Sequence, residues 1–209
     1  MPELFNGVIK FREEDFILHK DLFENLKDKQ SPHTLFIGCS DSRVVPTLII
    51  KSLPGELFII RNIANIVPPY RETEEYVATT SAIEYAVQVL NVENIVVCGH
   101  SNCGGCRALY MEDEKLLKIP HVKKWLELAK RAKDKLLSNL QDDSLPEDKL
   151  EWMTEQANVI EQIKNLLTYP YIIDKYIEGK LKIYGWYYII QTGEIYNYNK
   201  DNGYFELIK

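Results

Sequence analysis

The chain has 209 residues, of which 45% are hydrophobic and 27% charged, an ordinary balance for a globular protein with one substantial core. Its formal net charge is −6, so no basic excess exists to neutralise phosphates, which argues against nucleic acid as the main partner. No run approaches the roughly 18 apolar residues of a membrane span, and the first residues lack the pattern of a secretory signal. We therefore expect a cytoplasmic protein of one domain, residues 1–209, with no membrane partner.

The first part of the chain alternates between helical periodicity and short apolar runs. In the segment 11–28, Leu18, Leu22 and Leu26 recur every four residues, which predicts an amphipathic helix. Apolar runs bounded by turn residues predict buried strands over 34–38, 56–60 and 94–98. Further helices are predicted over 73–90, 121–140, 146–167 and 170–179, and Pro146 suits the first turn of the third of these.

The C-terminal part is different, because aromatic residues become frequent. Apolar runs over 181–190, 193–198 and 203–208 are joined by Thr192-Gly193 and Asn202-Gly203, and Asn-Gly is a strong hairpin signal. The earlier strands alternate with helices, so they are expected to pair in parallel. The sequence thus predicts an α/β fold: a mostly parallel central β-sheet flanked by helices, with antiparallel edge strands and an extended N-terminal helix in an arm, residues 1–28.

Two polar loops follow two of the predicted parallel strands. The first contains Cys39, Asp41 and Arg43, and the second contains His100 and Cys103. The carboxyl ends of strands are where ligands bind in open α/β sheets. Zinc prefers sulfur and imidazole ligands, and three protein ligands leave a position for water, as catalytic zinc requires. The residues therefore predict a metal that assists hydration or hydrolysis of a small molecule.

The same residues admit other interpretations. Buried free cysteines and hydrogen-bonded core histidines are common without any metal. The sequence from Cys103 to Cys106 also forms the C-x-x-C pattern of redox proteins, although not in a thioredoxin-like context. Cys98 lies within a predicted buried strand and is expected to be a core residue. A carboxylate such as Asp41, held ionised by Arg43, could accept a hydrogen bond from a metal-activated water.

The motifs C-S-D-S-R (39–43) and G-H-S-N-C-G-G (99–105) resemble the signature loops of the β-carbonic anhydrases. Segments 54–70, 81–100, 158–172 and 183–196 are similar to the same family. The resemblance implies reversible hydration of carbon dioxide to bicarbonate and a proton, by attack of zinc-bound hydroxide. It further implies one zinc ion per chain on Cys39, His100 and Cys103, with Asp41 and Arg43 as the catalytic dyad.

The resemblance also implies a substrate pocket and an assembly. Gln30, Phe58, Ile63, Tyr85 and Gly104 match positions that bind substrate in plant-type members of the family. The family builds its site at a subunit interface, so a homodimer or a higher homo-oligomer is expected, with the N-terminal arm packed across it. Hydrolysis of carbon disulfide or carbonyl sulfide on the same scaffold is the alternative that the sequence leaves open.

Members of this family differ in the resting state of the site. In one branch the aspartate swings onto zinc, and bicarbonate binds a regulatory pocket made by a tryptophan, an arginine and a tyrosine. Here Arg61 and Tyr188 match two of these positions, but Phe36 replaces the tryptophan and lacks its N–H donor. We therefore expect the open, plant-type site, with Asp41 paired to Arg43.

Overall fold

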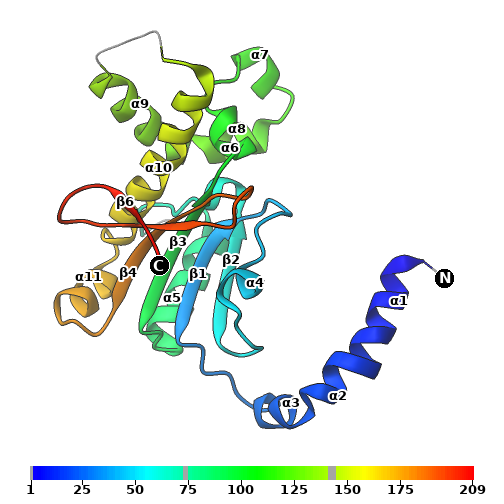
Figure 1. Cartoon of the computed structure of the whole chain (residues 1–209). Coiled ribbons are helices and arrows are strands. Elements are labelled where there is room, and N and C mark those ends of the chain that lie inside the picture. Colours follow the sequence, from blue (N-terminus) through cyan, green and yellow to red (C-terminus); the bar gives the residue numbers. More distant parts are fainter. Residues whose placement is uncertain (1, 73–74, 141–144) are drawn as a thin grey trace.

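The central sheet has six strands in the order β2-β1-β3-β4-β5-β6. The computed structural model describes residues 2–72, 75–140 and 145–209 (Figure 1). The strands are β1 (Thr34–Cys39), β2 (Leu57–Asn62), β3 (Asn94–His100), β4 (Lys182–Tyr188), β5 (Ile195–Tyr198) and β6 (Phe205–Leu207). The first four pair in parallel, and β5 and β6 add antiparallel strands at one edge. The predicted fold class is confirmed.

Helices surround this sheet, and most lie where the sequence predicts them. The N-terminal arm contains α1 (Glu3–Lys10), the π-helical turn η1 (Phe11–Asp15), α2 (Phe16–Leu18) and α3 (Lys20–Leu26). The next elements are α4 (Pro46–Ile50), η2 (Ile63–Asn65), α5 (Val77–Glu84), η3 (Tyr85–Val89) and α6 (Gly104–Ala108). They are followed by α7 (Asp113–Leu116), α8 (Pro120–Leu126), η4 (Glu127–Ala129), α9 (Lys130–Asn139), α10 (Glu147–Leu166) and α11 (Pro170–Ile177).

Several boundaries differ from the prediction. The helix predicted over 73–90 begins at Val77, and positions 73 and 74 lie outside the described residues. The helix predicted over 121–140 is divided into α8, η4 and α9. Pro146 precedes α10 as its cap residue instead of lying in its first turn. The helices α4, α6 and α7 have five, five and four residues, too few to show an apolar period in the sequence.

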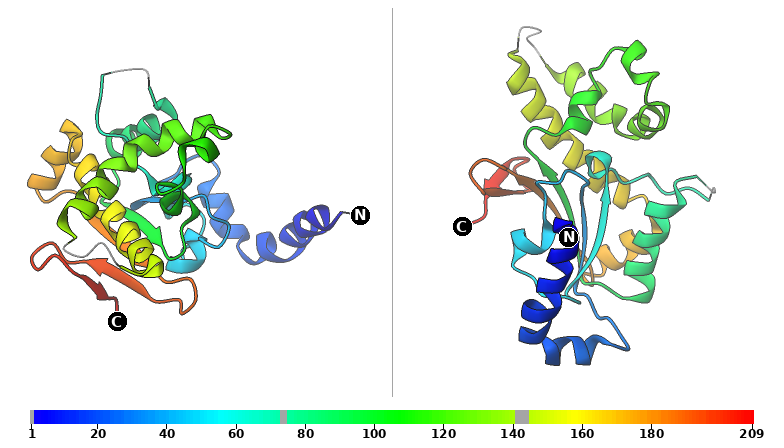
Figure 2. Two further views of the ribbon diagram at one scale, coloured as in Figure 1. Left: turned by 90° about the horizontal axis from the view of Figure 1, so that it is seen from above. Right: turned by 90° about the vertical axis from the view of Figure 1, so that its right-hand side faces the viewer.

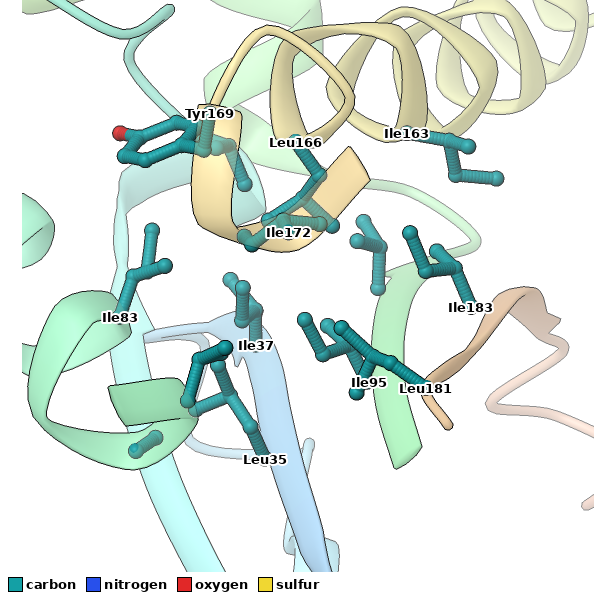
Figure 3. Packing of buried hydrophobic residues seen from close by; sticks show 14 of the residues in the cluster. Leu35, Ile37, Ile83, Ile95, Ile163, Leu166, Tyr169, Ile172, Leu181 and Ile183 are labelled. Carbon is teal, nitrogen blue, oxygen red and sulfur yellow. The ribbon is translucent and has the colours of Figure 1, made fainter. Parts of the chain in front are cut away.

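The main core lies between one face of the sheet and the helices α5, α10 and α11. Leu35 and Ile37 of β1 face Ile163 and Leu166 of α10, with Ile83 of α5 beside them (Figure 3). All of these side chains are at most 4% exposed. On the opposite face a smaller cluster contains Phe36, Val96, Cys98 and the partly buried Trp186. Strands that are covered on both faces have continuous apolar sequences, so β1 and β3 could be predicted from the sequence.

The N-terminal arm stands away from this body, as the two further views show (Figure 2). Its helical structure begins at Glu3, so the prediction that it starts near residue 11 was wrong. The turn-forming pair Asn6-Gly7 hides the extension in the sequence, although Leu4 and Val8 continue the apolar spacing. None of the residues in its four helical segments is buried.

Within the described part of the chain, no helix is both long enough and apolar enough to cross a membrane.

Candidate metal centre

Three side chains meet at the carboxyl ends of β1 and β3. Cys39 and His100 are the last residues of these strands, and Cys103 directly precedes α6. Their ligand atoms all lie within 4.8 Å of one another, and the two thiol sulfurs are 4.0 Å apart. All three residues are buried. The parallel pairing of adjacent strands thus brings together the residues that the sequence singled out.

The donor atoms of this group fit a metal ion. His100 is fully buried, and its Nδ1 donates a hydrogen bond to the Ser101 carbonyl at 3.0 Å. Its Nε2 has no hydrogen-bond partner, although buried polar atoms are nearly always paired. A hydrogen bond from one ring nitrogen to a carbonyl is the usual way in which the other nitrogen is directed toward a metal. Two thiols and one imidazole nitrogen are a donor set suited to zinc.

The thiols of this group are unfavourable as bare thiolates. Hydrogen bonding to Cys103, followed by burial, raises the pKa of Cys39 to about 12. Contact with the Cys106 thiol is the largest cause that raises the pKa of Cys103. Metal binding requires deprotonated cysteines, so a divalent cation here would compensate the cost that burial imposes on the charged form.

Asp41 and Arg43 form a bidentate ion pair beside the metal-ligand group. Arg43 Nε donates to Asp41 Oδ1 at 2.9 Å, and Nη2 donates to Oδ2 at 2.7 Å. These bonds hold the pKa of the Asp41 carboxyl well below its usual range. Asp41 Oδ2 lies 3.9 Å from the unpaired Nε2 of His100, which places an ionised carboxylate next to the candidate metal position.

The loop between β1 and α4 is held in place by other contacts. Arg43 also donates to the Asn102 carbonyl at 3.0 Å, so it joins the two polar loops. Arg61 donates to the carbonyls of Cys39 and Asp41 at 3.0 and 2.6 Å. The guanidinium of Arg61 is therefore engaged with the backbone of the first loop. These contacts fix the positions of the ligand and the carboxylate together.

Glu155 of α10 is a supporting residue that the sequence did not indicate. It is 2% exposed, and its Oε1 accepts the backbone N–H of Cys103 at 2.6 Å. Its Oε2 accepts the Tyr187 hydroxyl, also at 2.6 Å. Burial raises the pKa of Glu155 to about 7. The carboxyl group thus ties a candidate ligand to both α10 and β4.

A row of buried amides on α10 continues this support. Asn158 Nδ2 donates to the Ala64 carbonyl at 2.9 Å, and Gln162 Oε1 accepts the Val67 N–H at 2.8 Å. Asn165 Nδ2 donates to the Val67 carbonyl at 2.9 Å. The segment they hold contains Ala64 and Asn65 in the left-handed region, with φ of 60° and 45°. Such a conformation persists only where the surroundings fix it.

This held segment packs directly against the second polar loop. A Cβ added to Gly105 would lie 2.8 Å from the Cβ of Ala64 and 2.9 Å from Ile63 Cγ2. Glycine at position 105 is therefore required by the close approach of the two segments. By contrast, Gly104 is exposed, and a Cβ added there would meet no atom within 4 Å, so position 104 has room for a side chain.

The predicted substrate residues are only partly brought together in one chain. The rings of Phe58 and Tyr85 lie 6.0 Å apart, and Ile63 is 39% exposed beside Gly105. Gln30 is exposed in the connection between α3 and β1. Among the described residues, no hydrogen bond, ion pair or aromatic contact joins Gln30, Phe58 or Tyr85 to the metal-ligand group. Cys98 is fully buried, as expected of a core residue.

The fold is a mostly parallel α/β sheet, and it carries a buried Cys–His–Cys group beside a carboxylate–guanidinium pair. Together these features define the class of protein as an α/β metalloenzyme. The carbonic anhydrase family model matches residues 34–195. A carbonic anhydrase of Helicobacter pylori (strain J99) is 42% identical, over 99% of this chain and 94% of the relative. One of Synechococcus elongatus is 40% identical, over 93% of this chain and 70% of the relative.

Solved structures agree with these relatives. The β-carbonic anhydrase CcaA is 39% identical, with a TM-score of 0.93 over 99% of this chain and 91% of that one. The Coccomyxa β-carbonic anhydrase in complex with acetazolamide is 29% identical, with a TM-score of 0.81 over 93% of this chain and 84% of that one. A tetrameric β-carbonic anhydrase of Sordaria macrospora is 32% identical, with a TM-score of 0.74 over 93% of this chain and 94% of that one. The chain belongs to the β-carbonic anhydrase family.

Proposed function

We propose that this chain catalyses the reversible hydration of carbon dioxide to bicarbonate and a proton, with one zinc ion held by Cys39, His100 and Cys103. The observation that carries the proposal is the buried Nε2 of His100, which has no hydrogen-bond partner. The ligand atoms of His100 and of the two cysteines lie within 4.8 Å of one another, so they can bind one ion together. When bound, zinc would supply a Lewis acid that can lower the pKa of a water molecule to about 7.

Asp41 and Arg43 have distinct roles in this proposal. Asp41 would accept a hydrogen bond from the attacking water and so orient its lone pair toward the carbon of carbon dioxide. Arg43 positions Asp41, because a bidentate guanidinium keeps the carboxylate ionised and unable to act as a donor. The carboxylate can therefore accept hydrogen bonds only, which excludes molecules that present no proton to it.

The pocket would be completed by a second subunit. Gln30 and Tyr85 are exposed in one chain, and the arm preceding Gln30 carries an apolar surface that the same chain leaves exposed. We propose that Gln30, Phe58, Ile63 and Tyr85 bind substrate at a homodimer interface, with the Gly104 amide as a donor to the developing bicarbonate. The tetrameric Sordaria relatives support assembly as a homo-oligomer.

We assign the site to the open, plant-type branch. Its support is the pairing of Asp41 with Arg43, together with Phe36, which contacts Trp186 at 6.4 Å between ring centroids. Phe36 cannot donate a hydrogen bond to an anion, and Arg61 is engaged with backbone carbonyls.

All four cysteines are free of disulfides, which supports a reducing, cytoplasmic compartment.

The test combines stopped-flow carbon dioxide hydration with zinc content per chain. The wild type should hold one zinc and hydrate carbon dioxide, and Cys39→Ala, His100→Ala and Cys103→Ala should each lose both. Cys98→Ala is the matched control and should keep both, because Cys98 lies in the core outside the ligand group. Full zinc occupancy in Cys103→Ala would contradict the ligand assignment. The same assay with carbonyl sulfide tests the alternative substrate.

A further inference from the structure

A second cavity lies between α10 and the C-terminal strands. Its volume is about 330 Å³, and none of the residues proposed to bind zinc or substrate lines it. Small-molecule sites have volumes on the order of 300–1,000 Å³, so a small ligand would fit. Trp152 of α10 and Tyr204, which precedes β6, belong to the lining and are 44% and 72% exposed. The cavity is therefore open to a molecule from solvent.

Aromatic rings make up most of the lining. Five of its eight residues are aromatic: Trp152, Tyr187, Tyr196, Tyr204 and Phe205. The rings of Tyr187 and Phe205 meet at 69° with centroids 6.2 Å apart, so they present surfaces in different planes. The face of an aromatic ring is electronegative and attracts cations. In the described part of the chain, lysines lie over the rings of Tyr110 and Tyr176, neither of which lines this cavity.

Glu194 gives the cavity a negative charge. It is the single charged residue that the described part of the chain contributes to the lining. Its Oε2 accepts the Thr192 hydroxyl at 2.8 Å. Among the residues that the structure describes, the salt bridges of the C-terminal region join Lys180 to Glu178 and leave Glu194 without a cationic partner. The cavity thus combines aromatic rings with one carboxylate whose charge the same residues do not balance.

We propose that this cavity binds a quaternary ammonium ion, with the methylated nitrogen against the aromatic rings and Glu194 as its counter-charge. The site is separate from the metal-ligand group, so the inference does not depend on the proposed function. It assigns the cavity a ligand class that the hydration of carbon dioxide does not require.

The lining favours this class over other cations. A divalent metal ion needs several oxygen ligands, and the cavity offers one carboxylate. A primary ammonium group has three N–H donors, each of which needs an acceptor, whereas most of the lining is aromatic. A quaternary nitrogen has no N–H, and its methyl groups can pack against ring faces while its charge is attracted by them.

The wall formed by Tyr187 is in place before any ligand binds. Tyr187 is 1% exposed, and its hydroxyl donates to Glu155 at 2.6 Å, which fixes the ring. A ligand therefore meets a surface that needs no ordering at this residue, which favours binding.

The test uses calorimetry on the assembled, zinc-loaded full chain. The probe is choline, and its matched control is 3,3-dimethylbutan-1-ol, which has the same shape with a neutral carbon in place of the nitrogen. We expect saturable binding of one choline per chain, and binding of the neutral alcohol at least about tenfold weaker. Glu194→Gln should weaken choline binding about tenfold. Glu178→Gln removes a carboxylate outside the cavity and should leave the affinity unchanged.

The tryptophan indole N–H signals of the same protein, measured by NMR, locate the ligand. Choline should shift the Trp152 signal but not that of Trp125, whose indole N–H donates to the Ile63 carbonyl. Trp152→Leu identifies the signal and should weaken binding; if this variant does not fold, the comparison of choline with the alcohol on the wild type decides.

Three results would overturn the proposal. They are equal affinities for choline and the neutral alcohol, wild-type affinity in Glu194→Gln, and no saturable choline binding by the assembled protein. The last of these is also the result expected if another subunit covers the cavity.

Discussion

The helix α10 is packed into the rest of the chain, whereas the N-terminal arm is exposed along its length. Nine of the 20 residues of α10 are buried, and its polar side chains hold the segments around the metal-ligand group. The arm buries none of its helical residues, and Leu4 and Leu18 are 78% and 77% exposed. The contacts that support the metal-ligand group are therefore made within one chain, whereas the same chain leaves the apolar surface of the arm exposed.

The largest effect on activity is expected at the pair Asp41 and Arg43, whose contacts are made within one chain. Asp41→Asn should keep zinc but lower kcat by about 10²–10⁴-fold, because the amide can donate a hydrogen bond where the reaction needs an acceptor. Stopped-flow assays alongside zinc analysis measure both properties. Ser42→Ala, an exposed neighbour in the same loop, serves as the control. An Asp41→Asn enzyme with wild-type turnover would remove Asp41 from the mechanism.

A smaller effect is expected where α10 supports the ligand. Glu155→Ala leaves the Cys103 N–H and the Tyr187 hydroxyl without their acceptor, so zinc affinity should fall about 10–100-fold. Competition with a chelator of known affinity measures this loss. Glu155→Gln retains an acceptor oxygen and should lie closer to the wild type. Lys164→Ala, at an exposed position of the same helix, should leave zinc affinity unchanged; equal losses in all three variants would contradict a specific role for Glu155.

The amide row should affect stability more than metal binding. Asn158→Ala leaves the buried Ala64 carbonyl without its donor, which should cost about 1–3 kcal/mol in the free energy of unfolding. Urea unfolding of the apoprotein measures this cost without a contribution from zinc. Gln156→Ala is a control on the same helix, at a partly buried position. An unchanged unfolding free energy for Asn158→Ala would show that the left-handed segment does not need α10.

The smallest effect on a single chain is expected in the arm. The double variant Leu4→Glu with Leu18→Glu should change the unfolding free energy of the subunit by no more than about 0.5 kcal/mol, because neither side chain is buried. It should nevertheless dissociate the oligomer, which light scattering after size-exclusion chromatography measures. Glu14→Gln changes an exposed polar residue of the arm and should leave assembly intact. A double variant that stays fully assembled would place the interface elsewhere.

Features that depend on residues close together in the sequence could be predicted, whereas features that depend on distant contacts could not. The strands β1 and β3 and the loops after them could be predicted, because their apolar runs and the ligands Cys39, His100 and Cys103 form local patterns. Glu155 was missed, because its partner Cys103 lies 52 positions away and no local pattern marks a buried carboxyl on a helix.

The amide row was missed for the same reason. Asn158 and Gln162 contact residues 94 and 95 positions earlier in the chain. Helical spacing does place Glu155, Asn158, Gln162 and Asn165 along one face of α10, a polar stripe within an otherwise buried surface. That stripe was the available signal, but it becomes meaningful only when the segment from Ala64 to Val67 is known to lie against it.

Zinc K-edge X-ray absorption of the loaded wild-type protein tests the central claim most directly. Two cysteines and one histidine predict two sulfur atoms at about 2.3 Å and one imidazole nitrogen at about 2.0–2.1 Å from the ion, with one further light atom. Cys103→Ala, if any zinc remains, should show a single sulfur. A shell of four sulfurs, or one with no sulfur, would contradict the assignment of Cys39, His100 and Cys103 as the ligands of an open catalytic site.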